Sequence, residues 1–225
     1  YRHAAQQISR DIRTKLIRRT AYGWILLPGA AGFEKNNGIV VNLSYWIFPA
    51  FNDFTKFDPA PKWGQLTQSG LKLVKAARFG QWNLPPDWLL LGHEPQNGKE
   101  REPQHGKDKK LSLPPQFAPQ FGYNAIRIPL YLAWAKHHEK DLMMPFINFW
   151  TSFTHGARGI AATANLLNNT VGLYEASPGF KAIIQLIYTS HGITTPVTVE
   201  EYSPQDYYSA SLLLLARLAK TETNF

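Results

Sequence analysis

The chain contains about seven segments with helical spacing of apolar residues, and strands do not alternate with them. Apolar side chains three and four positions apart are typical of helices with one buried face. The predicted helices cover residues 1–20, 48–57, 63–79, 124–138, 142–154, 178–190 and 204–219. A doubly wound parallel sheet needs strands and helices in turn, so this order excludes it. The sequence therefore predicts an all-α fold and a single domain over residues 1–225.

Local signals place the ends of several helices. Ser44 is the predicted N-cap of the helix 48–57, and Pro49 fits its first turn. Gly192 follows the helix 178–190, where a left-handed residue commonly ends a helix. These signals predict definite stops between the helices.

Three segments lack helical periodicity. Residues 39–41 form a short extended run, and residues 159–174 contain several asparagines and are predicted to be irregular. Residues 91–119 are rich in Pro, Gly, Lys, Glu and Gln and carry hardly any apolar pattern. We expect this third segment to be a long polar loop or insertion.

Composition narrows the classes of function. Aromatic residues make up 13% of the chain, and their rings either fill a bulky core or line a groove for a flat ligand. The net charge of +8 permits nucleic-acid binding, but much of the charge lies in two places, residues 10–19 and 99–110, and not in one stripe. A gel-shift assay at two salt concentrations would test whether the chain binds nucleic acid. The preferred explanation of the positive net charge is that it keeps the protein soluble.

Several kinds of site and segment are not expected. The chain has no cysteine, which excludes disulfides and thiolate sites. No apolar run reaches the roughly 18 residues of a membrane helix, so no membrane partner is expected. The triplet 137–139 lacks the spacing of a zinc helix, and we expect neither a metal nor an organic cofactor. No signal peptide is visible and the chain begins with Tyr1, so we expect that a leader or a longer segment precedes it in the source protein.

The most distinctive polar feature is a pair formed by Asn124 and Arg127. The two side chains are three residues apart at a predicted helix start, within an otherwise apolar run. Residues at this spacing share a helix face. With Tyr123 and Tyr131 beside them, they are predicted to form the floor of a cleft.

This segment and four others resemble one enzyme family. In chain order the motifs are Leu26-Leu27-Pro28-Gly29 with Gly32-Phe33, Asn42-Leu43-Ser44-Tyr45, Leu84-Pro85-Pro86-Asp87-Trp88, Tyr123-Asn124-Ala125-Ile126-Arg127 and Asp206-Tyr207-Tyr208. Together they resemble glycoside hydrolase family 8, and most of all the endoglucanases that accompany bacterial cellulose synthesis. The resemblance implies a periplasmic or secreted bacterial protein, a β-glucan partner and no cofactor.

The same resemblance implies an (α/α)6 barrel. Twelve helices with their connections need on the order of 250–350 residues. About seven helices therefore look like the C-terminal two thirds of the barrel, incomplete at its N-terminus. The family's general acid, a Glu, would precede Tyr1. A separate or covalent N-terminal segment is the expected partner, because an open barrel leaves apolar faces exposed and the chain alone should aggregate.

The resemblance also assigns roles to individual residues. Asn124 lies at the position of the family's base Asp, Tyr45 matches a tyrosine that holds the attacking water, and Arg127 lines the cleft. Further positions that match the glycan cleft are Tyr123, Tyr207 and Tyr208, with Trp88 and Trp46 as weaker candidates for stacking. Alternative interpretations are core packing for Tyr45 and Trp46, and neutralisation of a buried carboxylate for Arg127.

An amide cannot accept a proton near neutral pH, so Asn124 cannot be a general base. Inversion of the anomeric centre needs both an acid and a base. Either a loop carboxylate replaces the base, or the protein binds glycan without turnover, or Asn124 orients water for another base. The loop candidates are Glu94, Glu100, Glu102 and Asp108.

The leading hypothesis is an inverting endo-β-1,4-glucanase, a cellulase. The alternatives are a catalytically impaired glycan-binding homologue, and a chitosanase or mixed-linkage glucanase.

Overall fold

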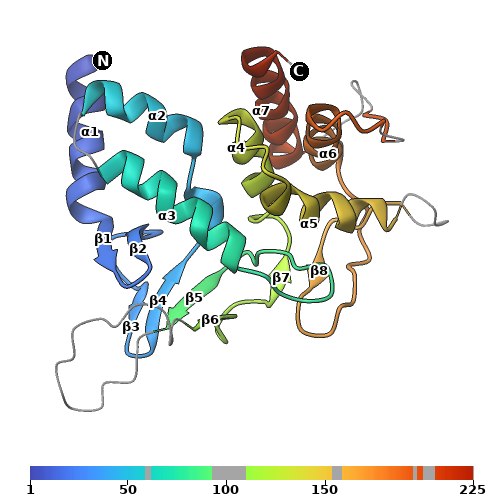
Figure 1. Cartoon of the computed structure of the whole chain (residues 1–225), viewed down its shortest axis with the longest axis horizontal. Helices are drawn as coiled ribbons and strands as arrows, with labels where there is room; N and C mark the ends of the chain where they lie inside the picture. The colour runs from blue at the N-terminus through green and yellow to red at the C-terminus, as the bar shows by residue number, and fades with distance from the viewer. Residues whose placement is uncertain (59–61, 93–109, 154–158, 195–196, 200–205, 225) are drawn as a thin grey trace.

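The computed structural model describes residues 1–58, 62–92, 110–153, 159–194, 197–199 and 206–224. Helices form the upper part of the molecule and short strands the lower part, as Figure 1 shows. The described residues contain seven α-helices, one 3-10 helix and eight short strands. The all-α prediction is therefore wrong in one respect, because three small sheets accompany the helices.

The helices follow the predicted order. They are α1 (Arg2–Lys15), η1 (Leu43–Tyr45), α2 (Phe48–Phe57), α3 (Lys62–Ala76), α4 (Arg127–Trp134), α5 (Lys140–Thr151), α6 (Pro178–Ser190) and α7 (Tyr207–Thr223). The bounds of α2 and α6 agree with the prediction, and α7 begins and ends a few residues later than predicted. By contrast, α4 begins at Arg127 and not at Asn124, which lies in the preceding turn.

The N-cap prediction for Ser44 is wrong. Asn42 caps η1, since its Oδ1 accepts hydrogen bonds from the Ser44 amide at 3.0 Å and from the Ser44 hydroxyl at 2.7 Å. The helix α2 begins after Ile47, with Pro49 in its first turn and no side-chain cap. The Ser44 hydroxyl is therefore bound to the Asn42 side chain in the short turn before α2, and it does not cap α2.

The end of the first predicted helix is a hairpin. The strands β1 (Ile17–Thr20) and β2 (Gly23–Leu26) pair antiparallel, with Ile17 opposite Leu26. Gly23 has a φ of +97°, a left-handed conformation that glycine adopts readily. The prediction of a helix as far as residue 20 is therefore wrong. The apolar residues before Ile17 have helical spacing, so the sequence pattern did not indicate where the helix ends.

A four-stranded antiparallel sheet lies below the helices. Its order is β3 (Glu34–Lys35), β4 (Gly38–Val41), β5 (Leu89–Gly92) and β6 (Leu111–Ser112). The extended run at 39–41 is confirmed, whereas β5 and β6 enter both ends of the predicted polar loop 91–119. A Cβ on Gly38 would lie 2.3 Å from the Leu91 carbonyl oxygen, so only glycine fits this register.

The ends of the segment between β5 and β6 are fixed to each other. The Gly92 amide donates to the Lys110 carbonyl at 3.0 Å. The Tyr22 hydroxyl lies 3.1 Å from the Gly92 carbonyl oxygen and 3.2 Å from that of Lys110, with its hydrogen bond shared between them. The chain therefore leaves the sheet and returns to it at one point.

A third small sheet positions the polar pair. The strands β7 (Gln120–Phe121) and β8 (Ala164–Asn165) pair antiparallel directly before the turn that leads into α4. The predicted irregular segment 159–174 is thus irregular except for β8 and isolated bridges. This sheet ties the start of α4 to a segment about 40 residues later in the chain.

One apolar core unites the helices and the sheets. Its largest fully buried side chains include Trp46, Trp63 and Trp150. The starts of α6 and α7 approach closely, and the Gly179 amide donates to the Ser209 hydroxyl at 3.0 Å. Tyr208 at the start of α7 donates to the Tyr123 carbonyl, and the Phe180 ring at the start of α6 lies 5.5 Å from the Tyr123 ring, so both helix starts lie beside the turn before α4.

Some apolar side chains face outward. On α7, Leu214 is 64% and Leu218 is 46% exposed, and Ile8 on α1 is also exposed. Such a surface agrees with the expectation of open apolar faces, while aggregation of the chain alone stays a prediction. None of the helices in the described ranges combines the length and the apolar character that crossing a membrane requires.

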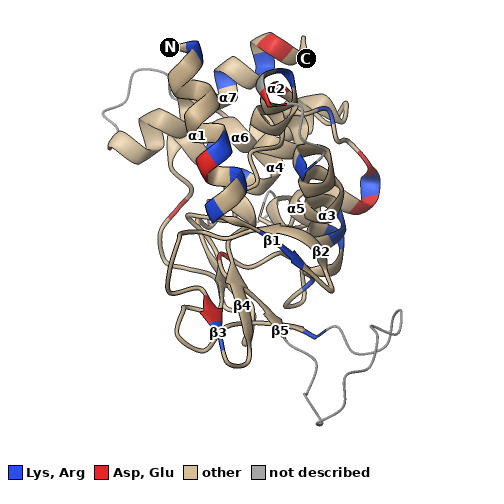
Figure 2. Cartoon of the chain, turned by 90° about the vertical axis from the view of Figure 1, so that its left-hand side faces the viewer, with Lys and Arg blue, Asp and Glu red and all other residues tan. Residues whose placement is uncertain are grey.

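Charges of both signs are dispersed over the surface. Figure 2 shows basic and acidic residues scattered over several elements on one side of the molecule, without a single basic stripe. Several of them pair, including Arg13 with Asp58 at 2.7 Å and Lys15 with Asp11 at 3.1 Å. This distribution does not favour nucleic-acid binding.

Candidate functional site

The candidate site is built around a turn at residues 122–126. Hydrogen bonds from the Ile126 amide to the Gly122 carbonyl (3.0 Å) and from the Arg127 amide to the Asn124 carbonyl (3.1 Å) lead the turn directly into α4. The Asn124 side chain thus stands just ahead of the first residue of the helix.

The predicted pairing of Asn124 with Arg127 is confirmed. The Arg127 Nη2 donates to the Asn124 Oδ1 at 2.8 Å. The guanidinium also lies over the Tyr45 ring, 5.6 Å from its centroid, which is within the range of a cation–π contact. Three of the predicted residues, Asn124, Arg127 and Tyr45, are therefore in one cluster, although their catalytic roles stay predictions.

Arg127 has further donor capacity. Its Nε is buried and has no hydrogen-bond partner among the residues the structure describes. An unpaired buried donor is costly, so it requires an explanation such as a bound water or another bound group. The alternative interpretation was that Arg127 neutralises a buried carboxylate. Its Nη2 instead donates to the neutral side-chain amide of Asn124.

Tyrosines form one side of the site. Tyr123 is 46% exposed, and its ring centroid lies 6.2 Å from that of Tyr208 and 5.5 Å from that of Phe180. The Tyr208 hydroxyl donates to the Tyr123 carbonyl. Burial raises the pKa of Tyr208 to about 12, against the opposing effect of Arg127, so this hydroxyl stays a donor at neutral pH.

Tyr207 lies at the start of α7 and is 89% exposed. Asp206 caps this helix by accepting from the Ser209 amide at 2.7 Å. The predicted pair Tyr207 and Tyr208 is therefore divided: one ring faces outward and the other contacts the turn.

The two tryptophans differ from the prediction. Trp46 is 0% exposed, and a Cβ on Gly70 would lie 2.6 Å from its Cδ1, so it is a core residue and the prediction of stacking on a glycan is wrong. Trp88 is half-buried and stacks on Phe117 with centroids 4.3 Å apart, and on Phe33 at 5.9 Å. One face of its indole is therefore already covered by Phe117.

The four loop carboxylates proposed as replacement bases, Glu94, Glu100, Glu102 and Asp108, lie outside the described residues. Among the described residues, no three His, Cys, Asp or Glu side chains gather so as to hold a metal ion.

A carboxylate whose role the sequence did not reveal lies under the turn. Asp87 is 3% exposed. Its Oδ1 accepts from the amides of Gly122 (3.1 Å), Asn124 (3.0 Å) and Ala125 (2.7 Å), and its Oδ2 from the Gln120 Nε2 (3.1 Å). The only signal in the sequence was its place in the motif 84–88, in which Trp88 alone received an assignment.

The Asp87 carboxyl has a perturbed acidity. Burial raises its pKa above the ordinary value of 3.8, although the hydrogen bonds it accepts lower the pKa. The folded chain then holds this proton more tightly than the unfolded chain. The residue's contribution to the free energy of unfolding therefore falls as the pH rises through the interval between the two pKa values.

We expect the side-chain carboxyl carbon of Asp87 to titrate with a midpoint above pH 3.8 in a carbon-13 NMR titration. The ordinary aspartate pKa of 3.8 serves as the reference. A midpoint for Asp87 below 3.8 would contradict the expectation and show that the N–H donors outweigh burial.

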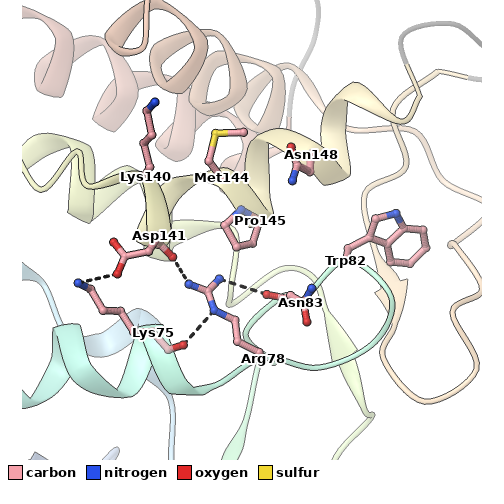
Figure 3. Close-up of a pocket in the computed structure, with 9 residues that line it drawn as sticks. All are labelled: Lys75, Arg78, Trp82, Asn83, Lys140, Asp141, Met144, Pro145 and Asn148. Carbon is pink, nitrogen blue, oxygen red and sulfur yellow. Dashed lines mark hydrogen bonds and ion pairs between the residues drawn. The ribbon is translucent and has the colours of Figure 1, made fainter.

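The site does not coincide with the cavity between α3 and α5. This cavity has a volume of about 370 Å³. Figure 3 shows the side chains that line it, namely Lys75, Arg78, Trp82, Asn83, Lys140, Asp141, Met144, Pro145 and Asn148. Arg78 donates to the carbonyls of Lys75 (3.0 Å), Asn83 (3.2 Å) and Asp141. Its donors thus join α3 to α5, and none of the residues predicted for the site lines this cavity.

The family model of glycosyl hydrolases family 8 matches residues 1–222 of the chain. A probable endoglucanase of Novacetimonas hansenii is 32% identical over 222 residues, which are 99% of this chain and 60% of that protein. Endo-β-1,4-glucanase CMCax from Acetobacter xylinum has a similar structure, with a TM-score of 0.84, 31% identity, and coverage of 100% of this chain and 65% of its own. Endoglucanase Cel10 from Klebsiella pneumoniae gives 0.79 at 28% identity, over 97% and 64% of the two chains.

The chain thus spans 60–65% of the length of these relatives. The structures it matches are (α/α)6 barrels, so its seven helices correspond to part of such a barrel. The resemblance that five short motifs indicated is confirmed over the whole matched range. The chain belongs to glycosyl hydrolases family 8.

Proposed function

We propose that the protein is an endo-β-1,4-glucanase that hydrolyses internal bonds of cellulose-like glucans by inversion. The observation that carries the proposal is the cluster of Asn124, Arg127 and Tyr45 beside Tyr123. It combines a flat aromatic surface with hydrogen-bond donors, which suits sugar rings and their hydroxyl groups. Similarity to proteins named endoglucanases supports the choice of substrate class.

The complete active site requires residues outside this chain. We infer that the other helices of the barrel, and the general acid, come from an N-terminal segment that is covalently joined or separate. More than a third of the length of each of these matched relatives lies outside the part that this chain covers. Apolar side chains on α1 and α7 offer surfaces for such a segment. We further propose that the protein acts in the periplasm or outside the cell.

The two candidate functions, an active glucanase and a glycan-binding homologue, differ in whether a residue of the protein serves as the base. Asp87 cannot serve, because it is buried and its oxygens already accept four hydrogen bonds. A base from the segment 93–109 keeps the glucanase active with Asn124 in place. Without such a base the protein is a glycan-binding homologue with little turnover, which is the second candidate function.

The first test is release of reducing ends from carboxymethylcellulose by the intact protein. Chitosan and a mixed-linkage glucan are assayed in parallel, and NMR of the first product distinguishes inversion from retention. We expect hydrolysis of the cellulose derivative to exceed that of the other two. Faster hydrolysis of chitosan or mixed-linkage glucan would change the substrate, while binding of cello-oligosaccharides without hydrolysis would favour the second candidate.

A further inference from the structure

Within the described part of the chain, all the hydrogen bonds of the buried Asp87 carboxylate go to groups at the entrance of α4. Three of its four hydrogen bonds go to backbone amides between residues 122 and 125, and the fourth goes to Gln120 just before them. The Asp87 amide also donates to the Gln120 carbonyl at 2.7 Å. A residue 35 positions earlier in the chain thus holds both the strand β7 and the turn that follows it.

The helix α4 lacks a cap of its own. Its N-cap residue is Ile126, which has no polar side chain, and no side-chain cap is present. The first amides of a helix have no partner within the helix, and unpaired amides in a buried place are costly. The amides of Arg127 and Ile128 donate to the carbonyls of Asn124 and Ala125, so the preceding turn satisfies the start of the helix. Asp87 in turn accepts from the amides of that turn, and its negative charge suits the positive end of the helix.

The turn is held from two sides. Asp87 accepts from its amides, while the Tyr208 hydroxyl donates to its carbonyl at Tyr123. At Gly122 there is no space to spare, because a Cβ there would lie 3.2 Å from the Asp87 Oδ2 and 3.0 Å from the Thr163 Cγ2. The backbone position of Asn124 is therefore determined by these contacts.

We propose that Asp87 is a positioning residue of this site: its carboxylate holds the turn at 122–126, and through the turn it determines where the Asn124 amide and the Arg127 guanidinium lie. Asn124 is bound at its own backbone amide, and Arg127 follows as the first residue of α4. The kinetic consequence rests on the proposed function, whereas the structural consequence does not.

The test uses Asp87→Asn, which keeps one acceptor oxygen, and Asp87→Ala, which removes the acceptor. Hydrogen exchange of the intact protein is followed at the amides of Gly122, Asn124 and Ala125. We expect exchange at these amides to become at least about tenfold faster in Asp87→Ala and to change less in Asp87→Asn. Amides later in α4, such as that of Tyr131, are expected to keep their protection.

The matched control is Asp58→Asn. Asp58 is also largely buried and accepts from the Arg13 Nε at 2.7 Å, but it lies at the end of α2, in another part of the fold. This variant should leave exchange at the turn unchanged. If Asp87→Ala does not fold, Asp87→Asn carries the test, with an expected acceleration confined to the same amides.

A second readout separates positioning from general loss of structure. In the intact protein, once hydrolysis of glucan has been measured, Asp87→Asn is expected to lower kcat at least about tenfold. KM and the number of glucan-binding sites per molecule should stay the same. An unchanged number of sites shows that the lower kcat is not caused by a loss of folded protein.

The two proposals fail in different ways. Unchanged exchange at the three amides in both variants would overturn the role of Asp87, even if glucan is hydrolysed. Faster exchange in a protein that hydrolyses no glucan would support the role of Asp87 in the turn and refute the proposed activity.

Discussion

Where no other carboxylate serves as the base, replacing Asn124 with Asp is expected to raise the rate of glucan hydrolysis by about 10²-fold or more, which is the lower range of what a positioned general base contributes. The substitution changes an amide into a carboxylate of the same shape, which can accept the proton of the attacking water. Arg127, whose Nη2 lies 2.8 Å from the Asn124 Oδ1, would stabilise the carboxylate's negative charge. The backbone amide of the residue would still donate to Asp87.

The measurement is the initial rate of reducing-end release from carboxymethylcellulose by the intact protein and its Asn124→Asp variant. Asn52→Asp makes the same chemical change at an exposed position of α2 and should not alter the rate. Equal rates for parent and Asn124→Asp would show that another residue is the base. The carboxylates of residues 93–109 would then be tested one at a time.

Gly179→Ala is expected to destabilise the fold by about 3 kcal/mol, at the upper end of what overpacking in a core costs. A Cβ at this position would lie 2.2 Å from the Ser209 carbonyl oxygen and 2.9 Å from the Leu212 Cβ. Both atoms belong to α7, so relief requires the two helices to separate. Separation would also lengthen the 3.0 Å hydrogen bond from the Gly179 amide to the Ser209 hydroxyl.

Urea unfolding of the two proteins checks this expectation. The control is Gly64→Ala, which also lies in the first turn of a helix, α3, and whose Cβ would have no neighbour within 4 Å. Alanine has the higher helix propensity, so the control should be neutral or stabilising by up to about 1 kcal/mol. A midpoint for Gly179→Ala equal to that of the parent would show that α6 and α7 pack less closely than described.

The helices were predictable where a local signal ended each of them. Pro49 lies in the first turn of α2, and Gly192, with a φ of +65°, follows the end of α6. The strands were not predictable in this way, because their partners are remote. Gly38 pairs with Gly92, and Leu91 pairs with Leu111 across a polar segment that gave no strand pattern.

In the candidate site, the contact between neighbouring residues was predictable from the sequence, and the support from a remote residue was not. The spacing of Asn124 and Arg127 predicted their contact, although Asn124 lies in the turn that leads into α4 and not in the helix itself. The support from Asp87 depends on how the loop before β5 folds onto that turn, and no local pattern shows this. Trp46 was misassigned because a tryptophan in the core and a tryptophan in a cleft look alike in sequence.

The fixed ends of the segment between β5 and β6 have an evolutionary consequence. Gly92 and Lys110 are joined to each other and to Tyr22, so the sheet is closed before the intervening residues begin. Doubling the length of a chain segment whose ends are joined costs only about 0.6 kcal/mol of closure entropy. Insertions and deletions can therefore accumulate between these two residues while the strands keep their register, and a lineage can gain or lose side chains there without altering the rest of the fold.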